Sequence, residues 1–397
     1  MEHAAQSPLI EAMQPFTTTI FSEMSALAAR LGAVNLGQGF PDEQGPDALV
    51  EAACKAIRDG HNQYAPGTGI PQLREAISEH QQRFYGLDLD PAREVLVTVG
   101  ATEAVAAAIL ALVSPGDEVV TFAPYFDSYP VMTARAGGIL RTCPLSFPDG
   151  DFDRERLAAI FSDRTRLVIL NTPHNPTGKV FSRDEMEFIA ELALRHDAWI
   201  LTDEVYEHLI LDEAEHIPMA CLGQVADRTL TVSSAGKTFS MTGWKVGWVS
   251  GPAAAVAAVT AVKQFLTFTA SGPFQYAVAE GLRQPVQAYS ELASRLRRRR
   301  DFLRDSLQGL GLATNNPAAT YFLLADFGPL GVSDAAAQMP EFAERVGVVG
   351  IPVSAFHLPP PEAYVQPLVR LAFCKRDEVL QEAMRRLGTV SGAPLGS

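Results

Sequence analysis

The chain has 397 residues, of which 47% are hydrophobic and 20% are charged, and this composition is typical of a globular protein. At roughly 100 to 200 residues per domain, its length predicts two or three domains. With 32 Lys and Arg against 46 Asp and Glu, the formal net charge is −14. Such a chain repels phosphates and anionic lipid heads, which disfavours a nucleic-acid or membrane-surface role. The basic run 297–300 lies inside a helical pattern and is expected to form a solvated helix face.

The spacing of cysteines and histidines indicates neither a disulfide framework nor a catalytic metal. The eight histidines form no H-E-x-x-H pattern. The N-terminus lacks the basic start and apolar run of a signal peptide, and the apolar stretches 104–113 and 253–262 are too short to cross a bilayer. We therefore expect a cytoplasmic protein without a bound metal. The cysteines, which form no C-x-x-C pair, are Cys54, Cys143, Cys221 and Cys374.

Short β-branched runs alternate with helical patterns through the middle of the chain. Helices are predicted over Thr102–Val113 and Asp184–Arg195. Strands that alternate with helices favour an α/β fold with a mainly parallel sheet sandwiched by helices, in which ligands bind at the carboxyl ends of the strands. The strands are predicted at 94–99, 118–122, 167–170, 199–203, 229–234 and 246–250.

The pattern changes near residue 287. A long charged helix, predicted over Tyr289–Leu310, is followed by the strand-like segments YFLLAD and VRLAF, which indicates a smaller α+β domain. The first 45 residues contain many glycines and prolines and are expected to form an irregular arm instead of a sheet element. We therefore expect a large cofactor-binding domain at 46–286, and a small domain made of 287–397 with the N-terminal arm 1–45.

The segment SSAGKTFSMTGWKVGW, at 233–248, has one feature of a phosphate-binding loop, because AGKT matches the end of the pattern G-x-x-x-x-G-K-[ST]. The first glycine of that pattern would fall at Thr231, so the match fails. The acidic strand end at Asp203 also precedes the lysine, which is an unusual order for a nucleotide hydrolase.

The same residues fit a different chemistry if Lys237 forms a Schiff base. An amine forms an imine only when it is deprotonated, so this lysine should lie in a pocket that lowers its pKa. A pyridine cofactor acts as an electron sink only while its ring nitrogen stays protonated, which needs a carboxylate partner. Asp203, at the end of a predicted strand, is a residue of the right type in the right place. Tyr206, three residues later, is expected to donate to the phenolic oxygen of the cofactor.

A cofactor phosphate needs hydrogen-bond donors and positive charge. Gly100, Ala101 and Thr102 lie where a strand ends and a helix begins, and the N–H groups and dipole of a helix N-terminus favour an anion. Ser234 and Lys245 flank the Schiff-base lysine and offer a hydroxyl and an ammonium group.

Three further residues have the chemistry to hold a ring or a carboxylate. Phe126, in PYFDSYP, can stack on the cofactor ring. Asn175, in the loop NTPHNPTG after a predicted strand, has an amide that can contact both cofactor and substrate. Arg370, in LVRLAF, has the planar fork that grips an α-carboxylate. Taken singly, each also fits an ordinary core, turn or surface position, and only their joint occurrence favours the functional interpretation.

Along essentially its whole length, the sequence closely resembles the class I aminotransferases of the pyridoxal-phosphate fold type I group. Nearest in appearance are the glutamine transaminase K, kynurenine and methionine aminotransferases and the actinobacterial N-succinyldiaminopimelate aminotransferases. The resemblance implies an α/β transferase of fold type I that uses pyridoxal 5′-phosphate. It rests on the segments NLGQGFPD, NQYAPGTGIPQLREAI, VTVGATEA, NTPHNPTGKVFS, TDEVYE, SSAGKTFSMTGWKVGW and LVRLAFCKRD.

The resemblance also implies the role of each candidate. Lys237 would form the internal aldimine and shuttle the proton, Asp203 would hold the ring nitrogen, and Tyr206 would contact the ring oxygen. The reaction would be a two-stroke transfer of an α-amino group from an amino acid to a 2-oxo acid. The remaining cofactor contacts would come from Ala101, Thr102, Phe126, Asn175, Ser234 and Lys245.

Arg370 and Asn175, with the backbone of Gly37, would hold the substrate carboxylate. Tyr64 matches a tyrosine that reaches the phosphate of the neighbouring subunit, which implies a homodimer with active sites at the interface; an ordinary aromatic in a turn stays open for it. One departure concerns 270–271, where Ala and Ser replace a bulky pair of the glutamine and kynurenine subgroup. An aromatic substrate is therefore not implied, and no second arginine is obvious for a distal carboxylate.

Two other functions compete with transamination. The same cofactor would serve β-elimination or γ-replacement on a substrate with a leaving group, so a β-lyase or replacement enzyme is the alternative prediction. A regulator built on this domain would need a DNA-binding module, for which an irregular N-terminal arm leaves no room. The expected substrates are N-succinyl-diaminopimelate with glutamate, or an amino acid of the glutamine or methionine type.

Overall fold

The computed structural model describes residues 8–16, 20–357 and 366–390. Its largest element is a seven-stranded sheet with the strand order β2-β8-β7-β6-β5-β3-β4. Strand β8 runs antiparallel to both neighbours, and every other neighbouring pair is parallel, so the predicted mainly parallel α/β sheet is confirmed. The strands are β2 (Val95–Val99), β3 (Glu118–Ala123), β4 (Ile139–Pro144), β5 (Thr165–Asn171), β6 (Trp199–Asp203), β7 (Thr229–Ser234) and β8 (Val246–Ser250).

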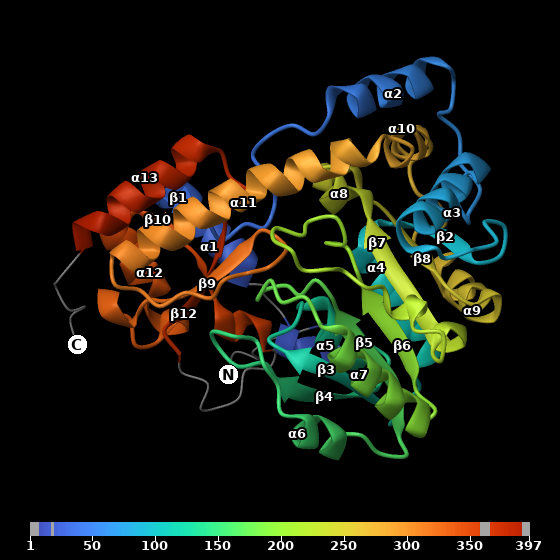
Figure 1. Cartoon of the computed structure of the whole chain (residues 1–397), viewed down its shortest axis with the longest axis horizontal. Coiled ribbons are helices and arrows are strands. Elements are labelled where there is room, and N and C mark those ends of the chain that lie inside the picture. The colour runs from blue at the N-terminus through green and yellow to red at the C-terminus, as the bar shows by residue number, and fades with distance from the viewer. Residues whose placement is uncertain (1–7, 17–19, 358–365, 391–397) are drawn as a thin grey trace, which may run out of the picture.

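Helices cover both faces of this sheet (Figure 1). The side chains of β5 illustrate this, because successive side chains of a strand point to opposite faces of the sheet. Leu167 and Ile169 pack in one apolar cluster with residues of α4 and α9, whereas Val168 and Leu170 pack in another with residues of α7. The α-helices between residues 47 and 282 are α2 (Asp47–Arg58), α3 (Pro71–Tyr85), α4 (Gly100–Leu112), α5 (Ser128–Arg135), α6 (Arg154–Ala159), α7 (Arg183–Arg195), α8 (Ala235–Thr238), α9 (Ala253–Lys263) and α10 (Gly272–Leu282).

Local sequence signals set several of the helix ends. The Ser182 side chain accepts from the Glu185 amide while the Glu185 side chain accepts from the Ser182 amide, so a capping box starts α7. Helix α3 begins at Pro71, whose missing N–H costs nothing in the first turn, and ends before Gly86, which adopts φ +71°.

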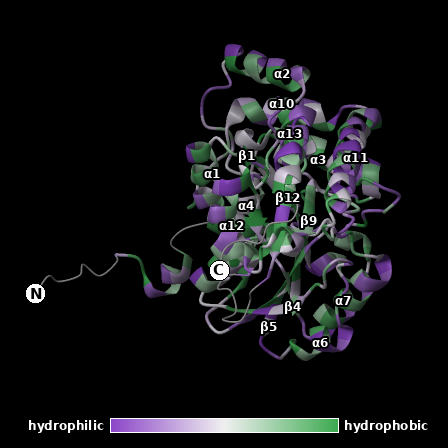
Figure 2. Ribbon diagram, turned by 90° about the vertical axis from the view of Figure 1, so that its left-hand side faces the viewer, coloured by the Kyte–Doolittle hydropathy of each residue, from purple (hydrophilic) through white to green (hydrophobic). Residues whose placement is uncertain are grey.

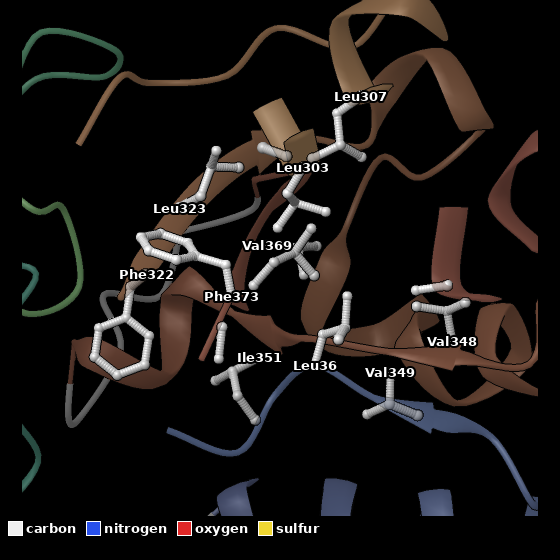
Figure 3. Packing of buried hydrophobic residues seen from close by; sticks show 14 of the residues in the cluster. Leu36, Leu303, Leu307, Phe322, Leu323, Val348, Val349, Ile351, Val369 and Phe373 are labelled. Carbon is white, nitrogen blue, oxygen red and sulfur yellow. The ribbon is translucent and has the colours of Figure 1, made fainter. Parts of the chain in front are cut away.

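Another apolar cluster lies beside the large sheet. It combines the antiparallel sheet β11-β12-β9 and the parallel pair β1-β10 with α1, α11, α12 and α13. Figure 3 shows Leu303 and Leu307 of α11 on one side of Val369 and Phe373, and Leu36 from the N-terminal segment on the other. The elements are α1 (Ile20–Leu31), β1 (Val34–Asn35), α11 (Val286–Gly309), β9 (Phe322–Asp326), α12 (Ala335–Val346), β10 (Val348–Val349), β11 (Ile351–Pro352), β12 (Leu368–Ala372) and α13 (Asp377–Leu387).

One prediction about these elements was wrong, and one strand was not predicted. The N-terminal arm is not irregular, since it contains the twelve-residue helix α1 and the strand β1, whose Val34 pairs with Val348. Its glycines and prolines conceal the amphipathic pattern of α1, which buries Met24 and Leu27. Strand β4 was not predicted, because this edge strand is mostly only half-buried and its sequence ILRTCP lacks a continuous apolar run. We retain the division at 46–286 as a proposal.

The ribbons of α11 and α13 carry hydrophilic segments on the outside of the molecule (Figure 2). Arg299 and Arg300, from the basic run in α11, are nevertheless buried. Arg299 is paired with Glu43 and Asp377, so the expectation of a wholly solvated face was wrong there. Within the described ranges, no helix is long and apolar enough to cross a membrane.

Candidate active site

A cavity of about 380 Å³ lies at the carboxyl ends of the sheet strands, where α/β folds bind ligands. It brings together eleven of the thirteen residues singled out from the sequence. Segments from the cluster beside the large sheet complete the cavity wall with Phe21, Phe322 and Arg370. The predicted residues in its wall are Gly100, Ala101, Thr102, Phe126, Asn175, Asp203, Tyr206, Ser234, Lys237, Lys245 and Arg370.

Lys237 lies in the short helix α8, immediately after β7. Its Nζ donates to the Tyr321 hydroxyl at 2.8 Å, and that hydroxyl donates to the carbonyl of Gly39 at 2.8 Å. Nζ also lies 5.6 Å from the ring centre of Tyr206 and 5.5 Å from that of Tyr321. Burial among these groups lowers the pKa of Lys237 to about 8, because an ammonium ion is poorly solvated there. The neutral, nucleophilic amine is therefore available at a lower pH than in an exposed lysine.

Asp203 ends β6 and is buried. Its Oδ2 accepts from the Tyr129 hydroxyl at 2.7 Å, whereas its Oδ1 is buried without a hydrogen-bond partner. Burial raises the pKa of Asp203, and the hydrogen bond from Tyr129 opposes that rise. An unpartnered buried carboxylate oxygen is costly unless a donor reaches it. A protonated pyridine nitrogen is such a donor, so this oxygen fits the ring of pyridoxal phosphate.

The wall at the start of α4 fits a phosphate. Gly100 begins this thirteen-residue helix with φ +73°, and a Cβ on it would lie 3.1 Å from Nζ of Lys245, so the helix N-terminus and the ammonium group are close together. On the opposite segment, the Ser234 hydroxyl oxygen accepts from the Gly236 amide at 3.2 Å, which leaves its proton for an acceptor. Helix dipole, hydroxyl and ammonium group favour the same anion.

Arg370, in β12, is 2% exposed and marks the other end of the cavity. Its guanidinium donates to the Asn175 side-chain oxygen at 3.1 Å and to the Gly37 carbonyl at 2.7 Å. The guanidinium carbon lies 4.0 Å from the ring centre of Phe322. Burial lowers the pKa of Arg370 to about 10, and its Nε has no partner. A buried cation with an unused donor, beside an amide side chain, can take a carboxylate with two hydrogen bonds.

Two predicted residues lie outside the cavity wall. Gly37 contacts Arg370 through its carbonyl, while its amide donates to the Asn35 side chain at 2.9 Å. Tyr64 is 83% exposed and packs edge-on against Phe268 at 5.5 Å between ring centres. It lines a separate hollow with residues 269–274, which include the Ala and Ser that depart from the family pattern.

The structure adds residues that the sequence did not single out. Tyr129 and Tyr321 hold the Asp203 carboxylate and the Lys237 amine, as described above. Asn171 donates to the Asp203 carbonyl at 2.7 Å and accepts from the Asn175 amide at 2.7 Å. The segments PYFDSYP and NTPHNPTG contain Tyr129 and Asn171, so their motifs had marked the right loops. No sequence pattern indicated Tyr321.

Comparisons with known proteins agree with this geometry. The family model described as "Aminotransferase class I and II" matches residues 32–387. The "Probable N-succinyldiaminopimelate aminotransferase DapC" of Mycobacterium tuberculosis is 48% identical over 394 residues, covering 97% of this chain and 99% of the relative. The "Methionine aminotransferase" of Escherichia coli is 41% identical over 370 residues, covering 93% and 95%.

Solved structures give the same result. The N-succinyldiaminopimelate aminotransferase of Mycobacterium tuberculosis superposes with a TM-score of 0.93 at 49% identity, over 96% of this chain and 100% of that one. The aspartate aminotransferase of Thermus thermophilus with maleate gives a TM-score of 0.89 at 33% identity, over 97% and 100%.

Proposed function

Because the chain belongs to the class I and II aminotransferases, enzymes that depend on pyridoxal 5′-phosphate, we propose specific roles for its cavity residues in moving an α-amino group from an amino acid to a 2-oxo acid. The observation that carries these roles is that Lys237 and Asp203 line one cavity and that Asp203 keeps an unpartnered oxygen there. Pyridoxal phosphate, when bound, supplies an aldehyde for the amine and a ring that withdraws electrons from the substrate Cα.

Asp203 holds a proton on the ring nitrogen. The Tyr129 hydroxyl favours the charged carboxylate, since a hydrogen bond to the charged form opposes the rise in the pKa of Asp203 that burial causes. A neutral carboxyl at this position would no longer stabilise a cationic ring. Phe126, also in the cavity wall, provides an apolar face for that ring.

Lys237 would hold the cofactor aldehyde through its neutral amine and would move the proton at the substrate Cα. Burial favours both duties, because it keeps the amine unprotonated at a pH where an exposed lysine is charged. The Tyr321 hydroxyl, at 2.8 Å from Nζ, holds the amine in place between transfers.

Arg370 and Asn175 take the α-carboxylate of the substrate and so orient its Cα toward Lys237. At the other end, the start of α4 with Ser234 and Lys245 takes the cofactor phosphate. Among the described residues of the cavity wall, the lysines and arginines are Lys237, Lys245 and Arg370, and each has one of the roles given above.

The first candidate donor is N-succinyl-diaminopimelate, and methionine is the second. The first is supported by the relative that matches 97% of this chain, and the second by the Escherichia coli enzyme. The relatives reported above are named for transamination, so we do not extend the alternative of β-elimination or γ-replacement.

A homodimer completes this proposal. Tyr64, Phe265 and Phe268 are exposed apolar or aromatic side chains, with Tyr64 at 83% and Phe265 at 84% exposure, and a second copy of the chain would cover them. In such a dimer, the Tyr64 hydroxyl would reach the phosphate of the partner's cofactor.

The test is a donor screen on the loaded enzyme, in which each half-reaction is followed by bleaching of the visible cofactor band. The donors are N-succinyl-diaminopimelate, methionine, glutamine, kynurenine and an arginine-like amino acid. Wild type and the control Lys55→Ala, which changes an exposed lysine, should bleach with the same donor, and Lys237→Ala should not turn over. Normal steady-state transamination by Lys237→Ala would refute the assignment.

A further inference from the structure

A cluster of three potential metal ligands lies outside the active-site cavity. His80 belongs to α3, and Glu207 and His208 follow β6. The Nε2 atoms of the two histidines face each other at 2.6 Å, and one ligand atom from each of the three residues lies within 4.8 Å of the others. His80 and Glu207 are buried, at 1% and 4% exposure, while His208 is only half-buried. Three ligands, two imidazoles and one carboxylate, thus converge on one point.

We propose that His80, Glu207 and His208 form a binding site for a divalent transition-metal ion of the zinc type. Two imidazoles and one carboxylate form a ligand set that zinc uses in proteins, with a fourth position open to water. Around a tetrahedral ion with Zn–N bonds of about 2.0 to 2.1 Å, the two nitrogens lie roughly 3.3 Å apart. The present separation is 2.6 Å, so the rings must part by about 0.7 Å to admit the ion.

Neighbouring donors already orient the ligands. The Tyr85 hydroxyl donates to Oε2 of Glu207 at 2.8 Å, and the Ser233 hydroxyl donates to Oε1. A carboxylate has about four lone-pair sites, so each oxygen can accept one such bond and still coordinate an ion. Partners of this kind hold metal ligands in place in known sites.

The Gln81 amide serves His80 in a similar way. Its Nε2 lies 3.4 Å from Nδ1 of His80, and its buried Oε1 has no partner. A half-turn of the amide brings Oε1 to Nδ1, where it accepts the Nδ1 proton and leaves the Nε2 lone pair of His80 for the ion.

Aromatic rings enclose the two histidines. The ring centre of Phe84 lies 4.7 Å from that of each histidine, and the ring centre of Tyr289 lies 4.4 Å from that of His208. Such a shell limits the access of water and so strengthens electrostatic attraction between the ion and its ligands.

The charges around the site favour a cation on balance. Glu204 adds a second buried carboxylate, which accepts from His216 at 3.0 Å and from the Met219 amide at 3.2 Å. Opposing it, the Arg83 guanidinium lies over the Phe84 ring at 4.7 Å, but it donates to the Leu282 carbonyl at 2.7 Å. With both carboxylates ionised and His216 neutral, two negative charges outweigh one guanidinium, and a dication would approach a negative site.

An ion here would tie α3 to the turn that follows Asp203 and Tyr206. No sequence motif could indicate this site, because 128 residues separate His80 from His208. Glu207 follows Tyr206 directly, and Ser233 precedes Ser234, so the ion would brace two segments of the active-site wall.

The test titrates chelator-treated holoenzyme with zinc chloride in a calorimeter, using wild type, His208→Gln and His61→Gln. His61 is exposed and stacks on Tyr276 outside the cluster. The His61→Gln variant therefore also loses one histidine, but it retains the cofactor and the four cysteines, which could bind zinc elsewhere. We expect one zinc ion per chain in wild type and His61→Gln, and at least a tenfold weaker affinity in His208→Gln.

A second measurement on the wild type removes the dependence on folding of the variant. Cobalt(II) at a site with two imidazoles and a carboxylate should give the intense visible bands of four-coordinate cobalt. Equal zinc affinity in wild type and His208→Gln, absence of stoichiometric zinc binding, or a weak octahedral cobalt spectrum would each overturn the proposal. The pair would then be a hydrogen bond between two neutral imidazoles.

Discussion

The hydroxyl of Tyr129 donates a 2.7 Å hydrogen bond to Oδ2 of Asp203, although 74 residues separate the two in the chain. This bond opposes the rise in the pKa of Asp203 that burial causes. It also fixes the carboxylate so that Oδ1 stays available in the cavity. Tyr129 thus favours the charge on which the cofactor ring depends, although it does not itself line the cavity.

Tyr129→Phe should weaken cofactor binding about tenfold, since a hydrogen bond to a charged group is worth about 1.5 to 3 kcal/mol. The pKa of Asp203 should rise in this variant, so cofactor retention should fall further as the pH is lowered. The measurement is the dissociation constant of pyridoxal phosphate at several pH values, with Tyr276→Phe as the control. Unchanged affinity and pH dependence in Tyr129→Phe would count against this role.

Arg370→Lys should raise the KM for the amino donor about 10- to 100-fold, with a smaller effect on cofactor affinity. A lysine ammonium cannot form the paired hydrogen bonds of a guanidinium, and each charge-assisted bond contributes about 1.5 to 3 kcal/mol. Steady-state kinetics measure the effect, and Arg376→Lys, at an exposed arginine, is the matched control. An unchanged KM would remove the carboxylate from Arg370.

The apoenzyme should capture pyridoxal phosphate faster as the pH rises toward about 8, and the rate should level off above it. Burial lowers the pKa of Lys237 to about 8, and only the neutral amine attacks the aldehyde, so the reactive fraction grows until that pKa is passed. Stopped-flow absorbance of the bound cofactor follows the capture. A rate that keeps rising toward the pKa of an ordinary lysine would contradict the lowered value.

Tyr64→Phe should leave the mass of the particle that of a dimer and weaken retention of the cofactor about tenfold, because the proposed contact is one hydrogen bond to a phosphate. Light scattering measures the mass, and dialysis against buffer measures the loss of cofactor. A monomer with full activity would refute the shared site, and an unaffected dimer would leave Tyr64 as an ordinary surface aromatic.

Much of the sheet could be predicted, because its central strands are buried on both faces and are rich in apolar and β-branched residues. The bounds predicted for β6, β7 and β8 agree with the structure at every residue. The edge strand β4 escaped prediction for the opposite reason, since Ile139 and Leu140 are only half-buried and polar residues follow them. Helix α1 was missed because its amphipathic pattern is short and is followed by a glycine-rich segment.

The cavity wall could largely be predicted from strand ends, since the carboxyl ends of parallel strands meet at one edge of the sheet. Asp203 ends a strand, Asn175 and Lys237 follow strands, and all three line the cavity. Tyr321 lies just before β9, in the apolar cluster beside the large sheet, and contacts Lys237, 84 residues away in the sequence. Hydrophobic periodicity carries no information on such a contact, because the contact depends on how that cluster packs against the large sheet.

The most direct test of the account is borohydride reduction of the holoenzyme, followed by peptide mapping of the reduced cofactor. Reduction fixes the bond between the cofactor and the amine that holds it. The account predicts a single labelled peptide, modified at Lys237, and no label after the same treatment of Lys237→Ala. Label at another lysine, or an unlabelled Lys237 in active enzyme, would contradict it.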